Sequence, residues 1–135
     1  MKKNLLIAAV VIAAVVIANV VNPNTEPTPN ATITETVSFK HQNAWYWVIQ
    51  YDSIATRQDL ENYARRWSNP NTTSHFFAYR DNLDLSVFKT KNLTFPVFAN
   101  TIVHGDIKPA FGFYKMNGDD TIQDDAVWLL EQAIE

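Results

Sequence analysis

The longest hydrophobic stretch of the chain lies at its beginning. Lys2 and Lys3 come before an almost unbroken apolar run from Leu5 to Val21. A basic start followed by such a run is typical of a membrane-targeting segment, and the lysines are expected to stay in the cytoplasm. Residues 4–21 just reach the length of a membrane-spanning helix, which favours a retained signal anchor, but the small residues near Ala18 also fit a cleaved signal peptide. The rest of the chain is therefore expected outside the cytoplasm, as the periplasmic or cell-surface part of a single-pass membrane protein. Cleavage after Ala18 would make it a secreted protein.

The next segment, residues 22–42, is interpreted as an extended linker. From Asn22 to Thr36 it is rich in Pro, Asn and Thr, with Ile33 as its one large apolar side chain. This composition favours extended chain, which at about 3.1 Å per residue would hold a domain on the order of 40 Å from the bilayer. The sequence thus predicts a leader in residues 1–21, the linker, and one small domain in residues 43–135.

The strongest strand pattern of the domain runs from Ala44 to Tyr51. One of its faces holds Trp45, Trp47, Ile49 and Tyr51, and the other holds Ala44, Tyr46 and Val48. A strand that is apolar on both faces is typical of the interior of a sheet. Two further strands are predicted from Ser74 to Arg80 and from Ala110 to Met116, the second followed by a turn at Asn117-Gly118.

The first helix of the domain is expected to begin after Thr56. Thr56 and Asp59 have the spacing of a capping box, in which each residue's side chain accepts a hydrogen bond from the other's amide. The apolar residues that follow recur at helical spacing: Leu60, Tyr63, Ala64 and Trp67. Pro70 ends the helix. Trp67 is expected to be one of its buried anchors.

A second helix is expected at the end of the chain. Thr121 precedes Asp124 at capping spacing, and nearby acids would complement the positive end of the helix dipole: Asp119, Asp120, Asp124 and Asp125. The apolar face consists of Ala126, Val127, Leu129, Leu130, Ala133 and Ile134. Leu130 is expected to be buried against the sheet.

Two other segments complete the pattern. Leu83 to Lys89 fits either a strand or a short helix. Leu93 to Val103 is rich in β-forming residues, but Pro96 has no amide to donate, which predicts a strand start, an edge strand or a cis-proline turn. The sequence therefore predicts an α/β or α+β fold, with a small mixed β-sheet flanked by two helices and an N-terminal hydrophobic helix before it.

Composition narrows the chemistry. The chain has no cysteine, which excludes disulfides, thiol chemistry and Cys-ligated metals. Lys2 and Lys3 are two of the 11 basic residues, and the leader holds none of the 14 acidic ones, so the exported part has a net charge of −5. Nucleic acid is therefore a poor partner. From Asn117 to Glu135 there are acids but no Lys or Arg, which predicts an acidic surface at the C-terminal end.

Histidines are the main candidates for catalysis or metal binding. His41, His75 and His104 lie far apart, and none has a partner at the ligand spacing of a helix or hairpin. If two of them meet, we expect His75 and His104 to do so, with Asp106 in the turn beside them. An exported enzyme or metal-binding domain centred on these groups is thus an alternative function. No motif calls for a cofactor, and no metal site is predicted.

The order of elements around one turn resembles a known fold. A strand ending at Tyr51 leads through Ser53 and Thr56 into a helix, and Pro96 follows a second strand and an unassigned segment. From Ala44 to Glu135 this order resembles the thioredoxin-like fold, in which two cysteines open the helix opposite a cis-proline loop. Ser53 and Thr56 occupy the cysteine positions, so the resemblance implies a redox-inactive binding scaffold with a cis-Pro96 close to both. A ferredoxin-like or SPOR-like sandwich is the alternative.

These patterns favour a non-catalytic function. We expect a membrane-anchored, extracytoplasmic binding module of an envelope assembly, held in the membrane through residues 4–21 and bound to an unidentified envelope protein. Tyr46 is a candidate contact because it faces the side of its strand opposite Trp45 and Trp47, where an aromatic ring could offer a stacking surface. The full set of candidate binding residues is Tyr46, Ser53, Thr56, Pro96, Asp124 and Asp125.

Overall fold

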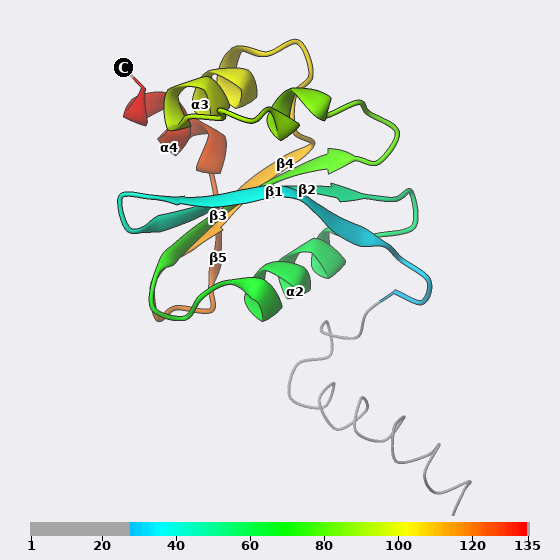
Figure 1. Ribbon diagram of the computed structural model, residues 1–135. Coiled ribbons are helices and arrows are strands. Elements are labelled where there is room, and N and C mark those ends of the chain that lie inside the picture. The colour runs from blue at the N-terminus through cyan, green and yellow to red at the C-terminus, as the bar shows by residue number, and fades with distance from the viewer. Residues whose placement is uncertain (1–27, 135) are drawn as a thin grey trace, which may run out of the picture.

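A β-hairpin opens the fold. The computed structural model describes residues 28–134, in which β1 (Ile33–His41) pairs antiparallel with β2 (Ala44–Tyr51) (Figure 1). Gln42 and Asn43 join the strands, with φ of 49° and 67°. Positive φ at both central residues is what a two-residue hairpin turn of type I′ requires. The expected strand β2 is confirmed, and its position between β1 and β3 is internal to the sheet.

The hairpin corrects the expected linker. β1 falls inside residues 22–42, because Val37 and Phe39 alternate with polar residues and pack against the core on one face of the sheet. The backbone before β1 is also held by the domain, since the Thr28 amide donates to an Asp59 carboxylate oxygen at 2.9 Å. The folded domain therefore begins no later than Thr28, and the boundary expected at the end of the linker is placed too late.

A helical crossover joins β2 to a parallel neighbour. α2 (Arg57–Trp67) starts at the expected capping box, where the Thr56 hydroxyl accepts from the Asp59 amide and the Asp59 carboxylate accepts from the Thr56 amide. β3 (Thr73–Arg80) then lies parallel to β2. Parallel neighbours need such a crossover because a tight turn would reverse the chain. The predicted helix and the second predicted strand are confirmed.

The second half of the domain completes a mixed sheet. Its elements are η1 (Ser86–Lys89), α3 (Phe95–His104), β4 (Phe111–Lys115), β5 (Ile122–Asp124) and α4 (Ala126–Ala133). β4 pairs antiparallel with β3, and β5 with β4, so the strand order is β1-β2-β3-β4-β5. The mixed α/β class is confirmed, and α3 is additional to the two helices expected for the domain.

α3 occupies most of the segment from Leu93 to Val103, whose composition favours a strand. The Thr94 side chain caps the helix, and Pro96 lies in its first turn, where a missing amide leaves no helical hydrogen bond unmade. No peptide bond among the described residues is cis, so the expectation of a cis-Pro96 is wrong. Burial of Phe98 and Ile102 on one helical face outweighs the β preference of the segment.

The last helix begins later than Thr121 and Asp124 predict. These residues lead into and form part of β5, whose pairing with β4 uses the segment first. Asp125 then occupies the N-cap of α4 in a left-handed conformation, with φ of 72° and without a capping hydrogen bond from its side chain. The acids expected to complement the helix dipole therefore precede α4, and its first turn contains none of them. Leu130 is buried as expected, with 2 % of its surface exposed.

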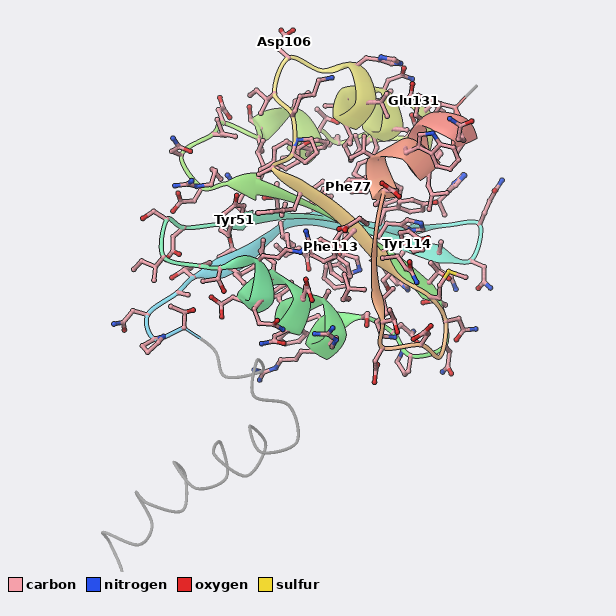
Figure 2. All side chains as sticks on the ribbon, turned by 180° about the vertical axis from the view of Figure 1, so that it is seen from behind. Tyr51, Phe77, Asp106, Phe113, Tyr114 and Glu131 are labelled. Atoms are coloured by element: carbon pink, nitrogen blue, oxygen red, sulfur yellow. The ribbon has the colours of Figure 1, made fainter. Side chains whose placement is uncertain are left out.

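Helices cover both faces of the sheet. α2 lies on one face, and η1, α3 and α4 lie on the other (Figure 1). Figure 2 shows Phe77 and Phe113 on opposite sides of the sheet, in agreement with their membership of the two separate cores. The core on the α2 side consists of Ile49, Tyr51, Leu60, Ala64, Phe76, Ala78 and Phe113. The other core consists of Val48, Phe77, Tyr79, Leu85, Phe88, Phe98, Ala99, Ile102, Ala126 and Leu130.

Trp67 belongs to neither core. It is 53 % exposed, so the expectation that it anchors α2 is wrong. Its ring lies 6.2 Å from that of Tyr63 and 5.5 Å from the Arg66 guanidinium, both on its own helix. Leu60 and Ala64 already fill the contact between α2 and the sheet, and Trp67 is the last residue of the helix.

The expected hydrophobic helix of residues 4–21 lies outside the described residues. Within residues 28–134, no helix combines the length and the apolar character that crossing a bilayer requires.

Candidate functional site

A row of aromatic side chains crosses the sheet from β1 to β4. Phe39 pairs with Tyr46, Tyr46 with His75, and His75 with Tyr114 in successive strands. Side chains of directly paired residues project to the same face, so these rings lie side by side. Ring centroids are 6.0 Å apart for Phe39 and Tyr46, 4.6 Å for Tyr46 and His75, and 5.7 Å for His75 and Tyr114. We call Phe39, Tyr46, His75 and Tyr114 the aromatic row.

The start of α3 closes one side of the aromatic row. The Phe95 ring meets Tyr46 edge-on at 5.1 Å and stacks on His41 at 3.9 Å, with 5° between the two planes. Phe95 is the first residue of α3, so the cap at Thr94 that sets the start of the helix also sets the position of this ring. The Phe95 ring thus packs the start of α3 against the β1–β2 hairpin beside the aromatic row.

Each member of the aromatic row is half-buried. The next paired positions toward the middle of the sheet, Val48 and Phe77, are by contrast completely buried. The row therefore lies at the margin of the face covered by α3 and α4, where each of its residues keeps part of its surface in solvent. Half-buried aromatic rings of this kind offer a large contact area that is already rigid.

Burial favours the uncharged forms of the two titratable rings at the centre of the aromatic row, Tyr46 and His75. Burial raises the pKa of Tyr46 above its ordinary value of 10.0. Burial lowers the pKa of His75 below its ordinary 6.5, although the Trp45 carbonyl oxygen, 3.4 Å from Nδ1, opposes this shift. Stacking and apolar contact are therefore the interactions that the row can offer, together with the polar tips of its rings.

Tyr46 is the only predicted binding residue that belongs to the aromatic row. Ser53 and Thr56 are exposed at the other end of β2, where the chain turns into α2. Pro96 is exposed on α3, which packs on the face of the sheet opposite α2. The close approach of Pro96 to the Ser53–Thr56 turn, which the thioredoxin-like resemblance implies, is therefore wrong.

His75, which belongs to β3, lies near the start of α3, whereas His104 lies at the end of that helix. His75 stacks on Tyr46, which contacts Phe95 at the start of that helix, whereas His104 is its last residue. A helix of this length spans about 15 Å. Asp106 is exposed and lies at the outer tip of the following connection (Figure 2). No group of three or more His, Cys, Asp or Glu in the described part of the chain is arranged to hold a metal ion.

Asp124 forms an ion pair at the surface of the domain. Its carboxylate lies 2.6 Å from the Arg57 guanidinium, which also sits 5.3 Å from the Phe111 ring centroid and 5.1 Å from that of Phe113. The pair ties β5 to the start of α2. Asp125 is exposed at the turn into α4.

Most of the aromatic row escapes prediction from the sequence. Phe39 falls in the expected linker, although Val37, Phe39 and His41 alternate with polar residues just before a turn, which is a strand signal. His75 is a candidate for catalysis or metal binding by residue type, and stacking is its role in the structure. Tyr114 lies in a predicted strand, but its neighbours depend on strand order, for which the sequence has no signal.

No protein-family model, curated protein or solved structure matches this chain.

Proposed function

We propose that this chain is a membrane-anchored, extracytoplasmic binding module that holds a protein partner of an envelope assembly on the aromatic row. The observation that carries the proposal is the row itself, a set of stacked rings that the domain leaves half-open. Rigid rings lose little conformational entropy when they are covered, and aromatic side chains dominate many protein interfaces. Because burial favours the uncharged forms of Tyr46 and His75, the partner is expected to present apolar or aromatic side chains.

The start of β1, where the described chain enters the sheet, and the aromatic row lie toward opposite ends of that strand. Ile33, where β1 begins, pairs with Tyr51, whereas Phe39 pairs with Tyr46 near the hairpin turn. A strand of this length spans about 30 Å. The row therefore lies toward the end of the sheet away from Ile33, which would let a partner cover it without meeting the point where the chain enters the sheet.

The proposed tether is shorter than the sequence predicts. Thr28 is held by Asp59, so only residues 22–27 separate the domain from the apolar run that ends at Val21. A fully extended chain gains about 3.6 Å per residue, which limits the separation of Val21 and Thr28 to roughly 25 Å. Such a tether favours partners that lie close to the membrane.

The proposal involves no thioredoxin-like binding loop. Pro96 is trans and lies on the opposite side of the sheet from Ser53 and Thr56. It also involves no nucleic acid, because the exported part of the chain carries a net negative charge.

Site-specific photo-crosslinking in intact cells tests the partner site. A photoreactive phenylalanine analogue is placed at Gln123, an exposed residue paired with Tyr114 at the edge of the aromatic row. The control position is Ser53, also exposed but at the opposite end of the sheet. We expect one adduct of defined mass from Gln123 and none from Ser53.

A second variant separates the aromatic row from general proximity. Tyr46→Ala removes the ring that stacks on His75, and should abolish the Gln123 adduct while circular dichroism still shows a folded domain. Equal adducts from Gln123 and Ser53, or an adduct that survives Tyr46→Ala, would exclude the row as the partner site.

The membrane address is tested separately. A C-terminal reporter that works only outside the cytoplasm should be active, and replacing Lys2 and Lys3 by Glu should impair or invert insertion. An inactive reporter on a chain that is nevertheless produced would contradict the proposed location without bearing on the aromatic row.

A further inference from the structure

A groove of about 570 Å³ lies along one side of α2, between this helix and the chain that leads into β1. The helix contributes Tyr63, Arg66 and Trp67 to the lining, and the chain before β1 contributes Thr28 and Ala31. Trp67 keeps 53 % of its surface exposed, although its side chain is large and mostly apolar. Apolar surface exposed beside a groove is unfavourable in water, and an occupant of the groove would cover it.

A tight turn sets the direction in which the chain enters this groove. The Ala31 amide donates to the Thr28 carbonyl oxygen at 3.2 Å, with Pro29 and Asn30 between them. Pro followed by a residue with positive φ, here 65° at Asn30, is typical of a type II turn. Such a turn reverses the backbone, so the backbone at Thr28 is antiparallel to the backbone at Ala31. The Thr28 amide also donates to Asp59 on α2, which holds this end of the turn against the helix.

The reversed direction is that of α2 itself. α2 forms the crossover between two parallel strands, so it runs antiparallel to β2, as β1 also does. The chain traced back from Thr28 is therefore aimed from Asp59, in the first turn of α2, toward Trp67 at its end. These two helix residues are about 12 Å apart along the axis, and five residues of polyproline-like chain span about 15 Å. Residues 23–27 are thus long enough to reach Trp67.

We propose that residues 23–27 of this chain occupy the groove as an extended, polyproline-like segment. Their sequence is Pro-Asn-Thr-Glu-Pro. Proline-rich segments dock in aromatic-lined grooves because their rings are apolar and their backbone is already restricted, so little conformational entropy is lost. Tyr63 and Trp67 supply two aromatic rings for this contact, with centroids 6.2 Å apart.

The charge of the segment also matches the groove. Arg66 forms no ion pair within the part of the chain that the structure describes, and its guanidinium lies 5.5 Å from the Trp67 ring centroid. Glu26 is the one charged residue of the segment. The acid in the groove lining, Asp59, already accepts hydrogen bonds from two backbone amides. Arg66 is therefore the cation available to Glu26.

The groove and the aromatic row lie on opposite sides of the sheet, because α2 covers the face that the row does not occupy. The segment and a partner can therefore be bound at the same time. Docking of the segment requires neither the proposed membrane anchor nor the proposed partner, so it stands or falls independently of both.

The solvent exposure of two tryptophans provides the test. Within the described residues Trp67 and Trp128 are 53 % and 57 % exposed, so without an occupant in the groove a soluble paramagnetic chelate should broaden their indole NMR signals almost equally. In the full chain, held in lipid nanodiscs, we expect the Trp67 signal to broaden about half as much as that of Trp128 or less, because the segment covers its ring. Equal broadening of the two signals would overturn the proposal.

Two variants identify the occupant. Replacing residues 22–27 by a Gly and Ser sequence of equal length removes the prolines and Glu26, and Trp67 should then broaden as much as Trp128. Glu26→Lys should lower the ratio of docked to undocked chains by about 2–5-fold, the effect of one exposed ion pair, and adding Arg66→Glu should restore it. Protection of Trp67 that survives the Gly and Ser replacement would assign the groove to lipid or to a second copy of the chain, and would overturn the proposal.

Discussion

Leu130→Ala should destabilise the domain strongly, whereas two tryptophan truncations should not. Leu130 is 2 % exposed and packs in the core between α4 and the sheet. Buried Leu→Ala changes remove about 2.7–5.0 kcal/mol from the free energy of unfolding. α4 is short, which allows some relaxation around the missing side chain, so we expect a loss of about 2–4 kcal/mol.

The tryptophans serve as controls for size and for helix. Trp67 is 53 % exposed on α2, and Trp128 is 57 % exposed on α4 itself. Trp128→Ala changes the same helix as Leu130→Ala, but it removes a larger side chain from the exposed face of that helix. Each tryptophan variant should lose less than about 1 kcal/mol, because more than half of the surface is already in water.

Urea unfolding of the intact chain, followed by circular dichroism, gives these free energies. The dependence of the unfolding free energy on urea should stay the same in all variants, since the surface exposed on unfolding hardly changes. At about 4 °C or more per kcal/mol, Leu130→Ala should also lower the melting temperature by roughly 10 °C or more. A loss below about 1 kcal/mol for Leu130→Ala, or a larger loss for Trp128→Ala, would refute this packing of α4.

Three further predictions follow from single groups. His75 has a lowered pKa in the folded state, so its contribution to stability is present above pH 6.5 and is lost as the pH falls through the folded pKa. In His75→Phe, the free energy of unfolding should therefore depend less on pH between pH 7 and pH 5 than in the wild type. An unchanged pH dependence would contradict the burial of this ring. Burial alone would raise the pKa of Asp59, but hydrogen bonds from Thr28 and Thr56 outweigh this effect and lower the pKa. Asp59→Asn should therefore reduce the free energy of unfolding by about 1–2 kcal/mol at pH 7, and this loss should shrink as acid protonates the wild-type carboxylate. A loss that does not change with pH would count against the role of the charged carboxylate. Gly118 has a φ of 75° and open space where a Cβ would lie, so substitutions there should cost only backbone strain. In the same urea titration, Gly118→Ala should lose about 1 kcal/mol of unfolding free energy and Gly118→Asn less. Equal losses would argue against the left-handed turn.

The length of the tether bears on how the module meets its partner. If residues 4–21 stay in the membrane, the fixed contact between Thr28 and Asp59 confines the domain to a thin layer above the bilayer. Confinement raises the effective concentration of a partner anchored in the same membrane, so a weak contact at the aromatic row would be sufficient for assembly.

The sequence by itself determined those helices and strands whose apolar residues recur with one regular spacing. Ala44–Tyr51 alternates without interruption, and Thr56 with Asp59 forms a capping box before a helical stripe, so β2 and α2 follow from spacing alone. The two faces of β2 and the burial of Leu130 follow in the same way, because side-chain direction is fixed by the geometry of strand and helix.

Tertiary structure decided the elements whose local signals conflict. Leu93–Val103 has β-forming side chains, yet it is helical because Phe98, Ala99 and Ile102 can bury together over the sheet only on one helical face. The segment after Thr121 carries capping residues, yet it pairs with β4 first. In both cases burial and strand pairing, which involve residues distant in sequence, outweigh preferences of a few tenths of a kcal/mol per residue.

The aromatic row depends entirely on such distant neighbours. Phe39, His75 and Tyr114 become one surface only through the register of separate strands, and the sequence contains no local signal for that register.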